Sequence, residues 1–243
     1  MFLHGFCENK DLWRAFEARL SAGFQTIALD LPGFGESGAN THYQSVEAMA
    51  EEVNRTLAAE QIDACAVVGH SMGGYVALAL ADLYPQRLRG LGLFHSTAYA
   101  DHEDKKRTRN QTADFIRQRG LDLFLETFVP SLFYGGRRAA MGDQVAAYRA
   151  MTRQTPVATA VAATLAMRDR PDRRHVLEEM DCPVMFIAGR DDTAVPMEAG
   201  RDQFWLPKNG TVHVLAETGH LGMYEREPET LAMVEGFARR VLG

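Results

Sequence analysis

A serine placed between two glycines is the feature of this sequence that most clearly indicates chemistry. The Gly-His-Ser-Met-Gly stretch at residues 69–73 follows an apolar run at residues 64–68 and precedes an apolar helical pattern. This context predicts a sharp strand-to-helix turn, on which the serine adopts a positive φ angle and only small residues two positions away let the strand and helix approach. We therefore predict that Ser71 is a nucleophile.

A serine hydroxyl is a poor nucleophile at neutral pH, so Ser71 needs a base, and that base needs an orienting carboxylate. His220 lies in a polar loop after the last apolar run, within reach of such a turn. Asp191 and Asp192 both follow another apolar run, and either one gives the chain order serine, aspartate, histidine. The residues predict a Ser-His-Asp triad with His220 as the base and leave the two aspartates as alternatives.

Short apolar runs alternate with helical patterns along the chain. Continuous runs of this kind predict strands buried on both faces of a parallel sheet that is covered by helices. The predicted strands span residues 25–29, 64–68, 90–94, 184–188 and 211–216, and the helices span residues 13–20, 45–60, 74–84 and a last segment that begins near Pro228. This order is typical of an α/β fold with a doubly wound, mostly parallel sheet and helices on both faces. Sites in such folds lie at the carboxyl ends of the strands, where each motif falls.

Residues 98–180 interrupt this alternation. They contain helical patterns at residues 104–119, 121–128, 137–153 and 156–168, and no strand pattern. We predict that they form an inserted helical cap on a core domain made of residues 1–97 and 181–243. The length of the chain fits one α/β core with an insertion.

With these motifs the chain resembles the cap-bearing, esterase-like serine hydrolases of the α/β-hydrolase fold over nearly its whole length. The H-G-x loop of that family matches residues 4–6, its D-x-P-G-x-G-x-S loop matches residues 30–37, and its G-x-x-D-x-x-x-P pattern matches Gly189, Asp192 and Pro196. The resemblance selects Asp192 over Asp191 as the acid of the triad.

The resemblance further implies that the backbone N–H groups of Phe6 and Met72 bind the oxyanion of a tetrahedral intermediate. Members of the family usually have a longer segment before this loop, which forms the first, antiparallel strands of the sheet. In this chain the loop begins at His4, so we expect those strands to be missing. A truncated or wrongly assigned start, a naturally short family, or a second subunit covering the sheet edge would each account for this.

Composition and charge exclude several classes of function. The formal net charge of -6 argues against nucleic-acid binding, which needs clustered Lys and Arg. The sequence has neither an apolar run of about eighteen residues or more nor an export signal, so we expect a cytoplasmic protein without a membrane segment. Its three cysteines lack the spacing of a zinc site or a disulfide framework. We expect neither a metal nor another cofactor.

The predicted reaction is the hydrolysis of a small, fairly apolar carboxylic ester through an acyl-enzyme. The residues predicted to line its substrate pocket are Phe34, His95, Tyr99, Phe128 and Leu221. Other reactions use the same triad, so a carbon–carbon bond hydrolase or lyase, a lactonase, a thioesterase and a perhydrolase remain as alternatives. A ligand receptor or signalling protein with slow turnover is the alternative from a different class. The expected partner is a small-molecule substrate, and a homo-oligomer is an option.

Overall fold

One sheet of six strands organises the molecule. In this computed structural model, which describes residues 1–38 and 45–243, the strand order is β2-β1-β3-β4-β5-β6. The strands are β1 (Phe2–Leu3), β2 (Ala28–Leu29), β3 (Cys65–His70), β4 (Leu88–Phe94), β5 (Val184–Gly189) and β6 (Gly210–Leu215). Every strand pairing within the described residues is parallel, so this part of the chain has no antiparallel first strands, as expected.

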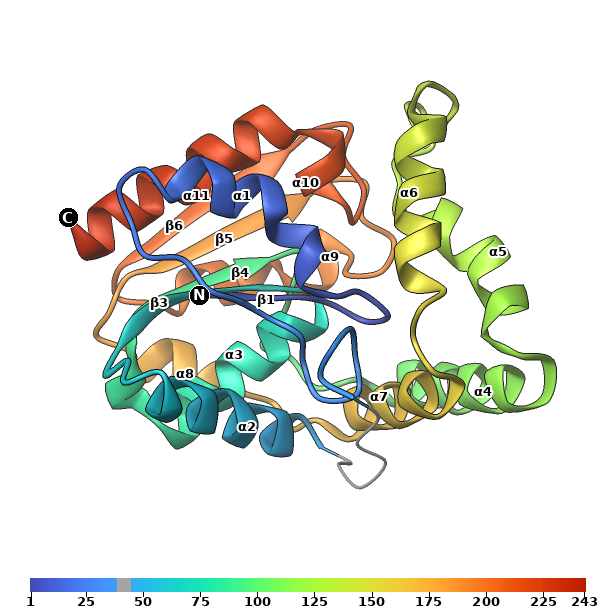
Figure 1. The fold of residues 1–243 in the computed structure, drawn as a ribbon, viewed down its shortest axis with the longest axis horizontal. Coiled ribbons are helices and arrows are strands. Elements are labelled where there is room, and N and C mark those ends of the chain that lie inside the picture. Colours follow the sequence, from blue (N-terminus) through green and yellow to red (C-terminus); the bar gives the residue numbers. More distant parts are fainter. Residues whose placement is uncertain (39–44) are drawn as a thin grey trace.

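Helices cover both faces of the sheet (Figure 1). On one face α1 (Arg14–Leu20) packs against α11 (Glu227–Leu242), and on the other lie α2 (Val46–Ala59), α3 (Met72–Leu83) and α8 (Arg174–Glu179). The shorter helices are η1 (Lys10–Trp13), η2 (Pro85–Arg87), η3 (Arg138–Met141), α9 (Met197–Gly200), η4 (Arg201–Trp205) and α10 (Gly222–Glu225). The doubly wound, parallel architecture predicted from the sequence is confirmed.

Two of the predicted strands differ from the structure. The run at residues 25–29 pairs only through Ala28–Leu29, because its neighbour β1 is two residues long. The prediction that the strands are buried on both faces is wrong for β6. This strand lies at the edge of the sheet, where Val212 and Val214 are 39% and 41% exposed. An edge strand is covered less completely than a central one, which the apolar pattern alone does not reveal.

Four helices project beside the sheet (Figure 1). They are α4 (Glu103–Arg119), α5 (Leu121–Leu132), α6 (Gly142–Thr152) and α7 (Val157–Asp169). α4 packs against α7, and α5 packs against α6. α8 also falls within residues 98–180, but it packs against α3 under the sheet. The division into a core and a cap at those boundaries therefore stays a prediction, while the helical character of the segment agrees with the sequence pattern.

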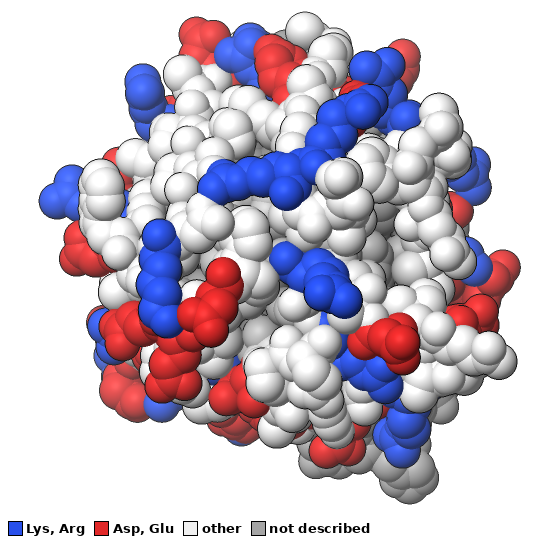
Figure 2. All heavy atoms as spheres, turned by 90° about the vertical axis from the view of Figure 1, so that its left-hand side faces the viewer, with Lys and Arg blue, Asp and Glu red and all other residues white. Residues whose placement is uncertain are grey.

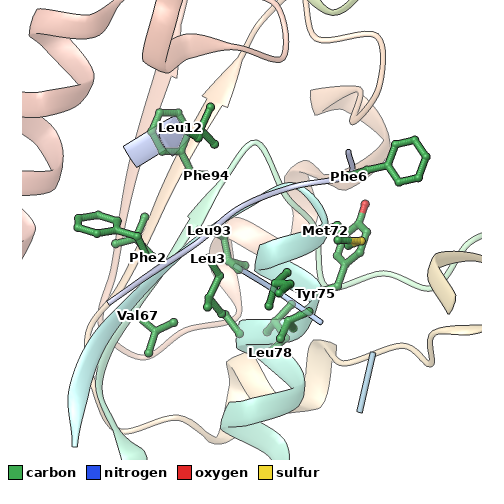
Figure 3. Packing of buried hydrophobic residues seen from close by; sticks show 14 of the residues in the cluster. Phe2, Leu3, Phe6, Leu12, Val67, Met72, Tyr75, Leu78, Leu93 and Phe94 are labelled. Atoms are coloured by element: carbon green, nitrogen blue, oxygen red, sulfur yellow. The ribbon is translucent and has the colours of Figure 1, made fainter. Parts of the chain in front are cut away.

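Apolar side chains hold the short strand β1 in the middle of the sheet (Figure 3). Its two residues point to opposite faces, as in any strand. Phe2 stacks on Trp13 with ring centroids 4.9 Å apart, and Trp13 also contacts Phe94 of β4 at 5.9 Å. Leu3 lies on the other face, near Leu78 of α3, and is completely buried. This packing anchors the loop that leaves β1 at His4.

The surface carries charges of both signs. Figure 2 shows Lys and Arg side chains interspersed with Asp and Glu side chains on one face of the molecule. Many are paired, as Glu235 is with Arg19 and Arg239. Within the described residues, every helix is too short or too polar to cross a membrane.

Candidate active site

Ser71 lies on a tight turn between β3 and α3. Its backbone has φ 50° and ψ -114°, a conformation that residues other than glycine rarely adopt. A Cβ atom on Gly69 would lie 2.3 Å from the carbonyl oxygen of Gly73, and one on Gly73 would lie 2.3 Å from that of Leu3. Both glycines are therefore required for the close approach of strand and helix. The turn has the geometry that the Gly-x-Ser-x-Gly pattern predicts.

Hydrogen bonds from neighbouring β4 hold this strained turn in place. The backbone N–H of Ser71 donates to the carbonyl oxygen of Phe94 over 2.9 Å. The hydroxyl of Ser96 donates to the carbonyl oxygen of Ser71 over 2.8 Å. Sequence reasoning did not assign a role to Ser96, because serines at strand ends are common and no pattern marks this one. The strand after the elbow thus contributes to its rigidity.

The structure brings Asp192 to His220 and leaves Asp191 apart. Asp192 Oδ2 accepts a hydrogen bond from His220 Nδ1 over 2.7 Å, and the two residues are 5% and 4% exposed. Asp192 Oδ1 accepts bonds from the backbone N–H groups of Ala194 and Val195. The side chain of Asp191 is exposed. The carboxylate next to the histidine is thus the one selected by the family pattern.

The environment keeps Asp192 ionised. Burial raises the pKa of this carboxyl, but the adjacent His220 and His95 outweigh burial, and the net pKa lies well below its ordinary value. An ionised acceptor 2.7 Å from Nδ1 favours the His220 tautomer that carries its proton there and leaves Nε2 free to accept another. That is the tautomer a general base needs.

His70 connects the serine turn to the loop of His220. Its Nε2 donates to the carbonyl oxygen of His220 over 3.0 Å, and the two imidazole rings lie 4.9 Å apart. The backbone N–H of His220 donates to the carbonyl oxygen of Leu132 at the end of α5. Ser71, which follows His70, is thereby held at the same end of the sheet as the Asp192–His220 pair.

His95 is built into the structure beside Asp192. Its Nδ1 lies 3.5 Å from Asp192 Oδ2, and its two ring nitrogens each lie 3.1 Å from a backbone N–H, those of Gly189 and Gly222. Burial lowers the pKa of His95 to about 4, so the ring is neutral at pH 7. Because both ring nitrogens already have partners in these contacts, the assignment of His95 to the substrate pocket stays a prediction.

Three side chains could in principle hold a metal ion. Within the described residues, one group, formed by His95, Asp192 and His220, has its ligand atoms within 4.8 Å of one another. These atoms already take part in the contacts described above: His220 Nδ1 bonds to Asp192 Oδ2, and a neutral His95 ring has one accepting nitrogen, which faces a backbone N–H. The donor set fits a hydrogen-bonded relay better than a metal centre, whose ligands need free lone pairs.

The H-G-x loop follows β1 directly and is held by its own side chains. His4 donates through Nδ1 to the Gly5 carbonyl and accepts through Nε2 from the backbone N–H of Leu31, over 2.9 Å each. Gly5 N–H donates to the buried carboxylate of Glu8, which the sequence patterns did not single out. Phe6 follows in this loop and Met72 opens α3. Their backbone N–H groups are at the strand ends that the oxyanion role requires, and that role stays a prediction.

The predicted pocket residues occupy different environments. Phe128 is half-buried and packs edge-on against Phe6, with ring centroids 5.9 Å apart. Tyr99 lines a pocket of about 260 Å³. Phe34 and Leu221 are fully buried, and the ring of Phe34 contacts His4. Phe34 and Phe128 thus both contact the H-G-x loop, at His4 and at Phe6 respectively, and all of these pocket assignments stay predictions.

Comparison with known proteins identifies the family. Residues 1–227 match the family model of the alpha/beta hydrolase fold. This chain belongs to the α/β-hydrolase family. Its parallel sheet, its helices on both faces and the turn at Ser71 agree with that membership.

Two curated relatives align with almost the whole chain. The dihydrolipoyllysine-residue acetyltransferase component of the acetoin cleaving system from Cupriavidus necator is 28% identical over 241 residues, covering 97% of this chain and 62% of that protein. A 2-hydroxy-6-oxononadienedioate/2-hydroxy-6-oxononatrienedioate hydrolase from Burkholderia vietnamiensis is 27% identical, with coverage of 99% and 86%. The chain thus spans less than two thirds of the first relative's length and most of the second's.

A solved structure shows the likeness of the whole fold. A thermophilic esterase from Thermogutta terrifontis, with malate bound, matches this chain with a TM-score of 0.93 and 28% sequence identity. The match covers 100% of this chain and 89% of that one. This member of the α/β-hydrolase family therefore has an esterase among its structural relatives.

Proposed function

We propose that this hydrolase cleaves small, fairly apolar carboxylic esters, with Ser71 as nucleophile, His220 as general base and Asp192 as the acid that orients the base. The observation that carries the proposal is the 2.7 Å bond from His220 Nδ1 to Asp192, in a loop tied to the serine turn through His70. The positive φ angle of Ser71 supports it, because this strain exposes a nucleophile at the end of the sheet. The esterase relative agrees with this choice of bond.

The proposed reaction has two halves. Ser71 Oγ attacks the ester carbonyl while His220 Nε2 takes the hydroxyl proton, and the resulting tetrahedral intermediate expels the alcohol, which receives that proton. Water then attacks the acyl-enzyme, again losing a proton to His220, and the carboxylic acid leaves as Ser71 is restored. Asp192 stabilises the imidazolium form of His220 in both halves. The scheme requires neither a metal ion nor an organic cofactor.

The proposed oxyanion hole consists of the backbone N–H groups of Phe6 and Met72. Phe6 follows the end of β1, and Met72 follows Ser71 at the start of α3, which supports this assignment. Donors fixed in the backbone stabilise developing negative charge without reorganisation, and losing one of them typically costs about 10²- to 10³-fold in rate.

The side chains near this loop favour a small apolar group in the substrate. The rings of Phe6, Phe124 and Phe128 form a cluster with centroid distances of 4.8 to 6.4 Å. Phe124 and Phe128 belong to α5, so this helix would contribute to the wall of the substrate pocket. An apolar wall of this kind binds an acyl or alkyl chain by removing it from water.

Labelling and turnover together test the proposal. A fluorophosphonate is expected to modify Ser71, and p-nitrophenyl acetate and butyrate are expected to be hydrolysed with sustained turnover. Ser71→Ala should abolish both, whereas Ser131→Ala, which alters an exposed serine of α5, should abolish neither. Labelling at a residue other than Ser71 would contradict the assignment of the nucleophile. A single burst without turnover would favour a receptor over an enzyme.

A substrate panel tests the bond. Lactones, thioesters and diketones should be compared with simple esters, because one relative is a hydrolase of 2-hydroxy-6-oxononadienedioate and the triad alone does not select a bond. We expect the highest kcat/KM for short esters. A diketone or lactone turned over more than about tenfold faster would replace the ester proposal while retaining the same nucleophile.

A further inference from the structure

Glu8 is a buried carboxylate with three donors from three parts of the chain. It is 2% exposed and lies just beyond the H-G-x loop. Its Oε2 accepts from the backbone N–H of Gly5 and from Nδ1 of His70 over 2.9 Å. Its Oε1 accepts from the hydroxyl of Tyr148 in α6 over 2.6 Å. Through these hydrogen bonds, Glu8 links the loop after β1, the end of β3 and helix α6.

His70 faces a hydrogen-bond acceptor at each ring nitrogen. Nδ1 faces the Glu8 carboxylate, and Nε2 faces the carbonyl oxygen of His220 at 3.0 Å. Neither partner has a proton to donate, since a carbonyl never does and an ionised carboxylate does not. Both contacts are hydrogen bonds only if both nitrogens of His70 carry protons. With Glu8 ionised, the geometry therefore requires the imidazolium form of His70.

The ionised forms of Glu8 and His70 stabilise each other. Burial lowers the pKa of His70, but Glu8 raises it, and the net pKa lies above its ordinary value. Burial raises the pKa of Glu8, but His70 and Tyr148 lower it, and the net pKa lies below its ordinary value. Burial of two opposite charges is stable only when each finds its partners, as both do here.

The other titratable groups around Glu8 and His70 are either neutral or bonded to one another. Those that face His70 are His4, His95, Asp192 and His220, and those that face Glu8 include His4, Tyr148, Tyr224 and Cys7. Burial lowers the pKa of His4 and His95 and raises the pKa of Cys7, Tyr148 and Tyr224, so these five are neutral at pH 7. Asp192 is ionised and already bonded to His220.

We propose that Glu8 and His70 form a permanently charged pair that positions the proposed oxyanion loop and the His220 loop relative to Ser71. Gly5 precedes Phe6, His70 precedes Ser71, and the carbonyl bound by His70 belongs to His220 itself. Phe6, Ser71 and His220 thus each lie within one residue of the pair or of a residue that the pair binds. Glu8 and His70 are positioning residues in this inference, which rests on the proposed function for its catalytic consequence.

The protonation state of His70 is tested directly by NMR of protein labelled with 15N in its histidine rings. We expect both ring nitrogens of His70 to remain protonated from about pH 6 up to pH 8, whereas an ordinary histidine, with a pKa of about 6.5, loses its proton within this range. His70→Asn identifies the signal by its loss. In Glu8→Gln the same ring should become neutral within this range, and in Glu8→Asp it should stay charged. A neutral His70 at pH 7 in the unaltered protein overturns the inference, whether or not the protein hydrolyses esters.

Kinetics of the same variants test the positioning role. Loss of one aligned oxyanion donor costs about 10²- to 10³-fold, so Glu8→Gln should lower kcat by about that factor with KM changed only a few-fold. Glu8→Asp should recover part of kcat because the charge remains. Tyr148→Phe removes one donor to Glu8 and keeps the ion pair, so it should lower kcat by less than tenfold.

The result that overturns the positioning role is a folded Glu8→Gln protein with kcat within twofold of the unaltered enzyme. If Glu8→Gln does not fold, Glu8→Asp, Tyr148→Phe and the NMR of the unaltered protein still decide. Failure of the proposed ester hydrolysis is recognised separately, because the unaltered protein would then neither turn over esters nor react with a fluorophosphonate at Ser71.

Discussion

Two adjacent aspartates show how strongly a residue's surroundings determine what it can do. Asp192 is buried, bonded to His220 and to two backbone N–H groups, whereas the side chain of Asp191 is exposed. The two residues carry the same carboxylate group one position apart in the sequence, but in different surroundings. Only one of the two can fix the tautomer of His220.

Substituting the aspartates separately tests this difference. Asp192→Asn should lower kcat for p-nitrophenyl acetate by about 10³- to 10⁴-fold, because an amide no longer holds the proton of His220 on Nδ1. Asp191→Asn is the matched control and should leave kcat within a few-fold. A larger loss in Asp191→Asn than in Asp192→Asn would reverse the assignment of the acid.

His95 should make the protein less stable in mild acid. Its pKa is about 4 in the folded protein and about 6.5 when unfolded, so the unfolded state binds the extra proton between these values. The free energy of unfolding should therefore fall as pH drops from about 6.5 to 4, by about 1.4 kcal/mol per pH unit for this one group. His4 and His213, whose pKa values burial also lowers, act in the same direction.

Urea unfolding at several pH values isolates the contribution of His95. In His95→Gln the slope of the unfolding free energy against pH over this window should be smaller by the contribution of one proton, about 1.4 kcal/mol per pH unit. This holds even if the variant is less stable overall. His213→Gln, at a half-buried position, should reduce the slope less. Identical slopes in His95→Gln and the unaltered protein would contradict a neutral, buried His95.

At the scale of elements, the contact between β1 and α3 is the tightest constraint on the serine turn. A Cβ atom on Gly73 would lie 2.3 Å from the carbonyl oxygen of Leu3, which is backbone and has no freedom to rotate away. The helix would have to shift away from the strand that carries the H-G-x loop. Because Ser71 and Phe6 lie on the two sides of this contact, the shift would separate the proposed nucleophile from half of the proposed oxyanion hole.

Gly73→Ala should therefore lose both activity and stability. We expect a loss of about 1 to 3 kcal/mol of unfolding free energy from overpacking, and kcat lowered by at least tenfold. Gly236→Ala in α11 provides the control, because a Cβ atom there meets nothing within 4 Å. That change should stabilise the helix by about 0.5 to 1 kcal/mol and leave kcat unchanged. Chemical denaturation and steady-state rates measure both variants, and equal behaviour of the two would be evidence against the steric argument.

At the scale of the whole molecule, several contacts tie the helices of residues 98–180 to the rest of the chain. Tyr148 bonds to Glu8, and the carbonyl of Leu132 accepts from His220. Arg173 pairs with Glu47 of α2 and Asp82 of α3. These links between the segment and the rest of the chain are buried or partly buried.

We accordingly expect one cooperative unfolding transition. Far-UV circular dichroism reports mainly the helices, and in Trp205→Phe, which removes the exposed second tryptophan, the fluorescence of the fully buried Trp13 reports the packing on β1. The two signals should change together with urea or temperature, as two-state behaviour requires. Separate transitions, with helix lost before the fluorescence changes, would show that the predicted cap unfolds by itself.

Local features of the sequence were sufficient to predict strands β2 to β6, the longer helices and the turn at Ser71, whereas the two-residue strand β1 was not among the predicted strands. Apolar runs, helical periodicity and glycine spacing depend on residues close in the chain, and each is imposed by backbone geometry or by burial. The helical character of residues 98–180 could be predicted for the same reason. The exposure of β6 could not, because it depends on which strand lies at the edge of the sheet.

What the sequence by itself determined was therefore the nucleophile's turn, the histidine loop and the α/β alternation. The residues alone left Asp191 and Asp192 open, the family pattern selected Asp192, and the tertiary structure places Asp192 at His220. Only the tertiary structure brought Glu8 to His70 and Tyr148, which lie 62 and 140 positions further along the chain. No local pattern encodes such contacts. They arise because β1 and β3 are neighbours in the sheet and Tyr148 of α6 reaches Glu8 beside them, so buried polar groups from distant segments must satisfy one another.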